Sequence, residues 1–472
     1  MSQSRRRFLG TLAGGAGAAA GAAMFGASAA SARGGPDAYR LPQPSVPGAV
    51  AGGQPSRPNI IYIMADDLGY ADLSGYGRPD YVTPELDRLA SEGVRLTHAY
   101  AIAPVCTPTR VGLMTGRYPA RHPIGLMEPL RLSDDDKHLG LDPAHPTISS
   151  LLKTAGYTNG LFGKWHLGVD RQFMPSAHGF DEHFGPLSGA VDHISHVNTA
   201  GESDLYHNGE RVDAAGYTTD LVVDHAVRFI ERRPEPFFLS LQGTLPHWPW
   251  QSRDDPPYPA GRSLRADGPQ DRYAAMVQAF DEGVGRILRA IDKAGIADRT
   301  LVIFTSDNGG ERYSNMGGLA RRKGQLWEGG IRVPAFARWP GVLPAGVTLP
   351  QVVNTLDWTA TMLAAAGAIP SQVFPLDGID VLPILSGRAP MLDRTVFWRT
   401  FQISRQAAAR QGTWKYLRDE DGEYLFDLVL DPGERNDLHE QEPARFARLR
   451  DAWEAWDAGM LEPIPLGAGA QP

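Results

Sequence analysis

The sequence has a single cysteine, Cys106, among 472 residues, which excludes an intrachain disulfide framework. Positive charge is not in excess either: the formal net charge is -8, so a nucleic-acid-binding surface is not indicated. Beyond the N-terminal segment, no stretch is long and apolar enough to cross a bilayer, and no internal repeat is found. The remaining composition, 42% hydrophobic and 21% charged, is that of a globular chain long enough for a large core and two domains.

The N-terminus carries an arginine motif before a long uncharged run. Ser4 to Leu9 reads Ser-Arg-Arg-Arg-Phe-Leu, and a Gly/Ala-rich run then ends in Ala30-Ser31-Ala32. This resembles a twin-arginine export signal with its cleavage site, and predicts a periplasmic or secreted protein that the twin-arginine machinery exports folded. An uncleaved membrane anchor is the alternative, but the run is only weakly apolar. We therefore predict a signal peptide at 1–32 and a flexible lead-in at 33–57.

Pairs of polar residues follow two apolar runs. The run at 59–64 suits a buried strand and leads directly to Asp66 and Asp67, and a second run leads to Asp307 and Asn308. Open α/β sheets place their sites at the carboxyl ends of strands. A bare Asp-Asp pair is usually a solvated turn, but carboxylates and an amide after buried strands favour a hard cation such as Ca²⁺, with Mg²⁺ as the alternative.

Cys106 stands just before a predicted helix. We expect Thr107 to cap this helix, Pro108 to occupy its first position and Gly116 to end it. A side chain at such an entry faces unpaired backbone N–H groups and the positive end of the helix dipole. Arg110 lies one turn further along on the same side. The arrangement suits an anion; the alternative is that Cys106 is a small buried apolar residue.

Lysines and histidines occur in two further loops. Lys164 and His166 follow a predicted strand, and residues two apart in an extended chain share a face, so both can point at one ligand. His247 stands between two prolines, which stiffen its backbone. The tryptophans beside it, Trp248 and Trp250, can form the floor of a sugar or aryl subsite or pack in the core.

The segment Cys106–Arg117, with Cys-x-Pro-x-Arg followed by Thr-Gly-Arg, resembles the signature of the type I sulfatases, a family of the alkaline phosphatase-like superfamily. Gly-Lys-x-His at 163–166 and Lys-Gly-x-x-Trp-Glu-Gly-Gly from Lys323 also resemble family motifs. The resemblance runs in family order from about Asn59 to Leu438. Two departures are Thr109, where Ser or Ala is usual, and the residues just before Lys323.

The resemblance implies a nucleophile and a metal. A formylglycine-generating enzyme would oxidise Cys106 to Cα-formylglycine, whose hydrated aldehyde attacks sulfur. One Ca²⁺ per chain would be held by Asp66, Asp67, Asp307 and Asn308. The implied catalytic residues are Cys106, Arg110, Lys164, His166, His247 and Lys323.

The resemblance also implies roles for these side chains. Asp307 would accept the proton of the attacking hydroxyl, and His247 and Lys323 would protonate the leaving oxygen. His166 would take the proton of the second hydroxyl, which expels sulfate. Lys164, together with Lys323, would offset negative charge, and Arg110 would orient the formylglycine.

The order of predicted strands and helices indicates an α/β domain followed by a small α+β domain. The resemblance implies a large mixed central sheet flanked by helices in the first domain. We predict a catalytic domain at 58–390, a C-terminal domain at 391–463 and a tail at 464–472. The expected helices span roughly 83–93, 147–155, 220–233, 272–295, 354–367 and 443–460.

The predicted function is that of a sulfatase acting on a sulfated carbohydrate or an aryl sulfate. One alternative is a phosphodiesterase or phosphonate monoester hydrolase, because related enzymes use the same fold and nucleophile on phosphorus. Another is a catalytically silent, sulfatase-like glycan-binding protein with an unmodified thiol, but the complete polar set argues against it. We expect the segments 197–217 and 252–271 to line the leaving-group site.

Overall fold

A computed structural model describes residues 57–464 of the protein, except 133–135, 137, 233–234, 260, 262 and 265–267. The predicted signal peptide, all but one residue of the predicted lead-in and nearly all of the tail lie outside the described residues. Among the helices that are described, none has both the length and the apolarity needed to cross a membrane.

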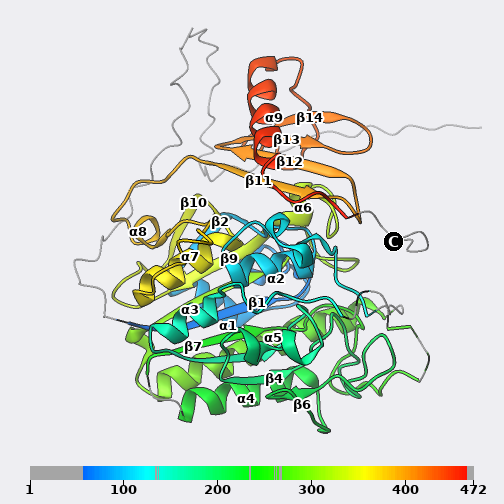
Figure 1. Cartoon of the computed structure of the whole chain (residues 1–472), viewed down its shortest axis with the longest axis vertical. Coiled ribbons are helices and arrows are strands. Elements are labelled where there is room, and N and C mark those ends of the chain that lie inside the picture. The colour runs from blue at the N-terminus through cyan, green and yellow to red at the C-terminus, as the bar shows by residue number, and fades with distance from the viewer. Residues whose placement is uncertain are drawn as a thin grey trace, which may run out of the picture. The chain divides into compact units, whose positions relative to one another are not determined.

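A large mixed sheet runs through most of the molecule (Figure 1). Its strands are β1 (Asn59–Ala65), β2 (Val94–Tyr100), β3 (Thr158–Gly163), β4 (Glu182–Gly185), β5 (Tyr206–His207), β6 (Glu210–Arg211), β7 (Phe237–Gln242), β8 (Thr300–Ser306), β9 (Arg332–Arg338) and β10 (Val347–Asn354). Their order is β10-β2-β9-β8-β1-β7-β3-β4-β5-β6. β1 pairs in parallel with β7 and β8, whereas β9 runs antiparallel to both β8 and β2, so the predicted mixed sheet is confirmed.

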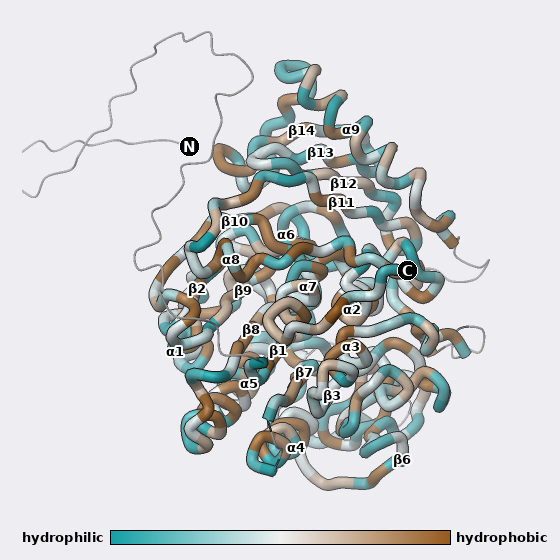
Figure 2. The backbone as a smooth tube through the Cα atoms, turned by 60° about the vertical axis from the view of Figure 1, so that its left-hand side comes forward, coloured by the Kyte–Doolittle hydropathy of each residue, from teal (hydrophilic) through white to brown (hydrophobic). Residues whose placement is uncertain are grey.

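Helices cover both faces of this sheet. The helices in this part of the chain are α1 (Pro84–Ser91), α2 (Cys106–Thr115), α3 (Ile148–Thr154), α4 (Thr218–Arg232), α5 (Gln270–Lys293), α6 (Glu328–Ile331), α7 (Thr355–Ala366) and α8 (Leu382–Leu385). The last helix, α9 (Pro443–Asp457), packs on a smaller sheet near the C-terminus instead. Successive side chains of β1 point to opposite faces. Ile60 and Tyr62 pack in the core with α2, α3 and α7, whereas Ile61 and Ile63 pack with α1, α4 and α5. The hydrophobic central strands are visible between the helices in Figure 2.

Local sequence explains where α7 begins and ends. Asn354 caps the helix by accepting hydrogen bonds from the N–H groups of Leu356 and Asp357, and the Asp357 carboxylate accepts one from the N–H of Asn354. Gly367 ends the helix with a left-handed φ of 66°. The predicted limits of this helix are therefore confirmed.

The predicted start of the Cys106 helix was wrong by two residues. Cys106 is itself the first residue of α2, and Val105 precedes it as the N-cap. Thr107 does not cap: its hydroxyl donates a hydrogen bond to the carbonyl of His166 and accepts one from the N–H of Leu130. The Thr107 side chain, which the sequence predicts as the cap, therefore forms tertiary hydrogen bonds instead. Gly116 ends the helix as predicted, with φ of 65°.

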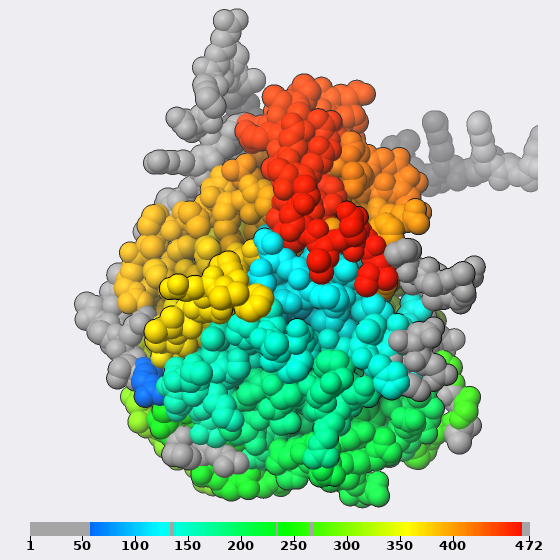
Figure 3. Space-filling view, in the orientation of Figure 1, coloured from blue at the N-terminus to red at the C-terminus, as the bar shows by residue number. Residues whose placement is uncertain are grey.

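A four-stranded antiparallel sheet follows, formed by β11 (Thr395–Thr400), β12 (Gln406–Gln411), β13 (Trp414–Arg418) and β14 (Glu423–Asp427). α9 packs on one face, against Ala407 and Ala409. The other face, with Trp398 and Leu417, packs on Tyr100 of the large sheet. Figure 3 shows α9 and these strands, in red and orange, projecting from the larger body. The predicted large α/β part with a smaller C-terminal α+β part is confirmed.

Candidate active site

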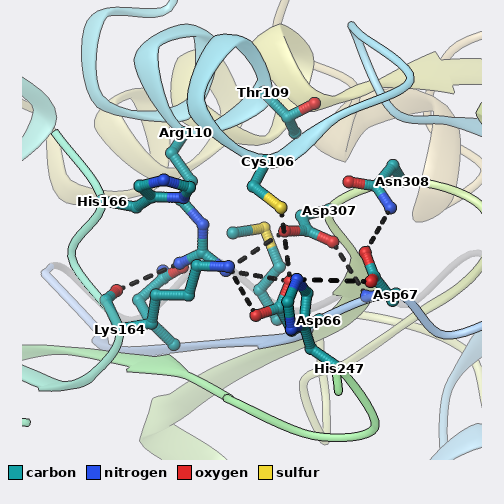
Figure 4. Close-up of polar contacts among 12 residues, drawn as sticks. Asp66, Asp67, Cys106, Thr109, Arg110, Lys164, His166, His247, Asp307 and Asn308 are labelled. Carbon is teal, nitrogen blue, oxygen red and sulfur yellow. Dashed lines mark hydrogen bonds and ion pairs between the residues drawn. The ribbon is translucent and has the colours of Figure 1, made fainter. Parts of the chain in front are cut away.

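The structure brings the predicted site residues together at the carboxyl edge of the large sheet (Figure 4). They come from the ends of β1, β3, β7 and β8, from the first turns of α2, and from the segment before α6. In this order they are Asp66 and Asp67, Lys164 and His166, His247, Asp307 and Asn308, Cys106 and Arg110, and Lys323. Four of these six stretches converge because neighbouring parallel strands end at the same edge.

The turn after β1 is held against the end of β8. The N–H of Asp67 donates to Asp307 Oδ1 at 3.1 Å, and the N–H of Leu68 donates to Ser306 Oγ at 3.1 Å. Asp67 has a left-handed backbone with φ of 65°, a conformation that costs energy for residues other than glycine, although aspartate and asparagine adopt it more readily than most. Such strain is held in place by its surroundings and is typical of functional sites.

Asp66 lies at the centre of the site. Its Oδ2 accepts a hydrogen bond from Lys164 Nζ at 2.7 Å, and its Oδ1 lies 3.6 Å from Cys106 Sγ and 3.8 Å from Arg110 Nη2. Arg110 Nη2 also reaches Asp307 Oδ2 at 3.2 Å. All five side chains are almost fully buried. Cys106 thus contacts Asp66 directly, and through Asp66 it is linked to Lys164 and Arg110.

Asp67 forms a second group of contacts beside the first. Its Oδ1 accepts a hydrogen bond from Asn308 Nδ2 at 2.8 Å, and its Oδ2 accepts one from Lys323 Nζ at 2.6 Å. His247 Nε2 lies 3.6 Å from the same Oδ2. Lys323 also lies 3.4 Å from Glu311. Asp67 therefore joins residues from β7, β8 and the Lys323 segment.

The three buried aspartates titrate differently because their cation neighbours differ. Burial works to raise the pKa of Asp66, but Lys164 and the nearby cations outweigh it and hold the pKa well below its usual value. Burial, together with the other carboxylates, raises the pKa of Asp67 to about 8 despite Lys323. Burial and Asp66 raise the pKa of Asp307 to about 6. The nearby cations therefore do not fully offset the negative charge of Asp67 and Asp307.

These residues fit an oxygen-liking cation. Asn308 Oδ1 is buried and has no hydrogen-bond partner among the described residues. Ligand atoms of Asp66, Asp67, Cys106 and His247 lie within 4.8 Å of one another. Because hard cations prefer carboxylate and amide oxygens, a divalent cation here would use the unpaired amide oxygen and offset the excess negative charge. The arrangement forms a buried acidic cluster able to bind a metal.

Cys106 lies at the entry of α2, where backbone N–H groups and the helix dipole favour an anion. Burial raises the pKa of its thiol, with Lys164 and Lys323 opposing this only in part. The unmodified side chain is therefore held as a neutral thiol in the described structure. Arg110, one turn further along, donates to the Lys164 carbonyl at 3.0 Å, which fixes its guanidinium beneath the helix entry.

The two histidines are fixed by backbone carbonyls. His166 Nε2 lies 2.9 Å from the Leu130 carbonyl, which can only accept, so Nε2 carries the proton and Nδ1 is left as an acceptor. His247 Nδ1 lies 2.6 Å from the Trp248 carbonyl, so the same reasoning leaves its Nε2 facing Asp67. Burial lowers the pKa of both imidazoles, which favours their neutral forms.

One sequence argument about His166 was wrong. Its φ is 59°, which is left-handed, so it does not continue an extended chain from Lys164. Instead, the ring of His166 is placed by the Leu130 carbonyl and by close contact with Gly189: a Cβ on Gly189 would lie 2.5 Å from His166 Cε1. Lys164 and His166 therefore meet the site through tertiary contacts rather than through a shared strand face.

A cavity of about 560 Å³ opens above Cys106, His166, His247 and Lys323. Its other lining residues are Val105, Pro129, Leu130, Arg131, Leu132, Gly189, Ala190, Thr199, Ala200, Trp248, Glu311, Gly324 and Ile403. This volume suits a small-molecule or saccharide leaving group.

Of the two segments expected to line the leaving-group site, only 197–217 contributes described residues to this cavity. Thr199 and Ala200 line the cavity, but no described residue of 252–271 does. Of the two tryptophans, Trp248 lines the cavity. Trp250 instead packs edge-on against Tyr313, with the ring centroids 4.7 Å apart. Ile403, from the C-terminal sheet, had no signal in the sequence because only packing between the two sheets brings it to the site.

Comparison with known proteins agrees with this site. The Sulfatase family model matches residues 58–368. The chain is 35% identical over 379 residues to the N-acetylgalactosamine-6-sulfatase of Mus musculus, covering 74% of this chain and 70% of that protein. It is 33% identical over 416 residues to arylsulfatase A of Bos taurus, covering 80% of this chain and 78% of that protein.

Solved structures share the fold. The structure of Ps i-CgsB in complex with k-i-k-neocarrahexaose superposes with a TM-score of 0.79 and 32% identity, covering 86% of this chain and 94% of that chain. The phosphonate monoester hydrolase of Agrobacterium radiobacter, at 21% identity and a TM-score of 0.63, shares the fold alone. The chain belongs to the type I sulfatase family and is a sulfuric ester hydrolase.

Proposed function

We propose that this sulfatase removes sulfate from a sulfated carbohydrate, with residue 106 as its nucleophile after conversion to Cα-formylglycine. The observation that carries the proposal is the position of Cys106 at the entry of α2, at the base of an open cavity and beside Asp66. The size and openness of the cavity favour a saccharide over a small aryl group. An aryl sulfate remains a usable test substrate, because it needs only the sulfate subsite.

We further propose that Asp66, Asp67, Asp307 and Asn308 hold one Ca²⁺. Support comes from the unpaired Asn308 Oδ1 and from the under-compensated carboxylates beside it. Bound there, the ion would supply a Lewis acid for a sulfate oxygen. Mg²⁺ is the alternative, but a site made mainly of protein oxygens favours Ca²⁺.

The chain's own cations would bind and orient the sulfate group. Lys323 and the N-terminus of α2 face the cavity, and Lys164 lies beneath it at Asp66. Fixed positive groups in a buried site stabilise charge that develops on sulfate oxygens in the transition state. Arg110 contacts Asp307 and the Lys164 carbonyl. It would therefore hold Asp307, the proposed base, in a fixed position relative to residue 106.

Proton transfer would use the carboxylate of Asp307 and the ring nitrogens of His166 and His247. Asp307, held close to Asp66 and Arg110, is placed to accept the nucleophile's proton. His166 Nδ1 has no partner among the described residues and is unprotonated in the tautomer that the Leu130 carbonyl selects, so it can act as the second base. Lys323 Nζ, at the cavity, can protonate the leaving oxygen, and His247 Nε2 can do so only when the His247 ring carries a second proton.

A panel of matched esters tests the proposal. Turnover should be measured with sulfated monosaccharides and oligosaccharides, an aryl sulfate, and the corresponding phosphate mono- and diesters and phosphonates. Sulfated saccharides should give the highest kcat/KM. Preferred turnover of the phosphorus esters would overturn the proposal in favour of a phosphonate monoester hydrolase or phosphodiesterase, and no turnover with an unmodified thiol would favour a glycan-binding role.

We also propose export through the twin-arginine pathway to the periplasm or exterior, supported by the Ser4 to Leu9 motif. Folding before export would let a formylglycine-generating enzyme act in the cytoplasm. Replacing Arg5 and Arg6 with lysine should leave the protein inside the cell, and unchanged export of that variant would contradict the proposal.

A further inference from the structure

A second cluster of metal-ligating side chains lies outside the active site. Glu182 begins β4, His207 ends β5, and His225 lies within α4. One carboxylate oxygen and one nitrogen from each imidazole lie within 4.8 Å of one another. None of these three residues lines the active-site cavity. In Figure 1, β4 and α4 lie at the end of the molecule away from the C-terminal sheet.

The two imidazoles are oriented by aromatic packing. The His225 ring stacks on Phe184 with centroids 3.7 Å apart and an 8° angle between the planes. The His207 ring lies edge-on to His225, with centroids 5.2 Å apart and an angle of 64°. Two imidazoles bound to one tetrahedral zinc ion, with Zn–N distances of about 2.0–2.1 Å, have ring centres about 5 Å apart. The observed separation therefore needs little rearrangement to accept a shared ion.

Space around the cluster permits binding, and the arginines beside it, Arg228 and Arg232, compete with a cation. Glu182, His207 and His225 line a cavity of about 250 Å³, together with the side chains of Asn208, Arg228 and Arg232. Arg232 Nη2 lies 3.3 Å from Glu182 Oε1, but the Arg232 side chain is 56% exposed. The Glu182 side chain is buried, but the Arg232 guanidinium already reaches solvent, so Arg232 can turn away when the carboxylate takes a metal ion. Arg232 thus competes with a metal ion for Glu182, and this competition limits the affinity of the cluster for the ion.

We propose that Glu182, His207 and His225 form a site for one Zn²⁺ ion, with water as the fourth ligand. Two imidazoles and a carboxylate suit this borderline ion, in contrast with the oxygen-rich active site. The ion would join the short strand β5 and its neighbour β4 to α4. Since binding to the folded state alone adds stability, the role we assign to it is structural.

Zinc titration by calorimetry tests the site. The full chain should carry Cys106→Ala, so that the active-site thiol cannot bind zinc, and saturating Ca²⁺ should be present throughout. One Zn²⁺ should bind per chain, and Zn²⁺ should raise the melting temperature. His207→Ala and His225→Ala should each weaken binding by at least about tenfold. Arg232→Gln should tighten binding by up to about fivefold, since a competing cation is removed.

The matched control is His138→Ala, an exposed histidine that pairs with Asp170 elsewhere on the surface. It should leave zinc affinity unchanged. Far-UV circular dichroism checks that each variant is folded, and His207→Ala and Arg232→Gln decide the question if His225→Ala misfolds. No zinc binding by the parent protein, or undiminished binding by a folded His207→Ala variant, would overturn the proposal.

Discussion

Glu128 Oε2 accepts a hydrogen bond from the backbone N–H of Phe401, with 2.9 Å between the oxygen and the nitrogen. The two residues are 273 positions apart in the sequence. The same oxygen also accepts a hydrogen bond from the N–H of Gln402 at 2.8 Å. Glu128 is buried and leads into residues 129–132, which form part of the active-site cavity wall, while Phe401 and Gln402 precede Ile403, another residue of that wall. This contact therefore joins two segments of the cavity wall.

Glu128→Ala should loosen this wall. Loss of the carboxylate leaves buried N–H groups unpaired, so the free energy of unfolding should fall by about 2–4 kcal/mol. KM for a sulfated oligosaccharide should rise several-fold, whereas KM for a small aryl sulfate should change less, because only the larger leaving group contacts the wall. Denaturant unfolding and steady-state kinetics with both substrates measure this. Exposed Glu420→Ala is the control, and equal KM changes for both substrates would argue against a positioning role.

Gly189→Ala should displace the His166 ring. The added Cβ would lie 2.5 Å from His166 Cε1 and 2.6 Å from Nε2, too close for any real contact. We expect kcat to fall by about 10- to 100-fold, in line with loss of an aligned general base, while calcium content stays unchanged. Kinetics and metal analysis check both parts. Gly459→Ala, where the nearest atom is 3.5 Å away, should be silent. Full activity of Gly189→Ala would show that His166 needs no fixed position.

Cys106→Ser should abolish multiple turnover. A serine in place of the cysteine lacks the aldehyde, so a sulfated side chain would have no second hydroxyl to release it. The deciding measurement is the peptide mass across Ala103 to Arg110, beside turnover of both proteins. Wild type should carry the aldehyde or its hydrate. A fully active wild-type preparation with only unmodified cysteine would refute the proposed nucleophile. The test uses a host whose formylglycine-generating enzyme does not convert serine.

Asp67→Ala should lose bound calcium and activity together while the fold survives. Asp67 contacts Asn308, Lys323 and His247 but lies outside the hydrophobic clusters, so its removal affects the site rather than the core. Metal analysis, circular dichroism and turnover test this. Exposed Asp421→Ala should retain all three properties. An Asp67→Ala variant that keeps both metal and activity would remove this residue from the metal site.

Acid should destabilise the protein partly through His122. Burial, then His145 and two arginines, lowers the pKa of His122 from 6.5 to about 3. Between these values the unfolded chain binds a proton that the folded chain does not, so stability contributed by neutral His122 is lost as pH falls below 6.5. This one group should cost about 2 kcal/mol between pH 6.5 and 5.0.

His122→Phe should therefore unfold with a shallower pH dependence than wild type over pH 6.5 to 5.0, where few carboxylates titrate. Urea unfolding at several pH values gives the two slopes. His138→Phe, which alters an exposed histidine, should keep the wild-type slope. Identical slopes for His122→Phe and wild type would show that His122 is protonated equally in both states.

The sequence by itself determined the features that depend on local pattern. Apolar runs located β1 and β8, and polar residues directly after them located Asp66, Asp67, Asp307 and Asn308, because parallel strands end at one edge. Capping chemistry located both ends of α7. The motif around Cys106 indicated the family, since it combines a nucleophile position, a helix entry and an arginine in one short segment.

Only the tertiary structure decided how distant segments meet. The start of α2 shifted because Thr107 bonds to His166 and Leu130 instead of capping. Ile403 reached the cavity through the packing of one sheet on another, and His207 met His225 through the pairing of β4 with β5 beside α4. Such contacts depend on register and packing over long sequence separations, and local periodicity carries no information about them.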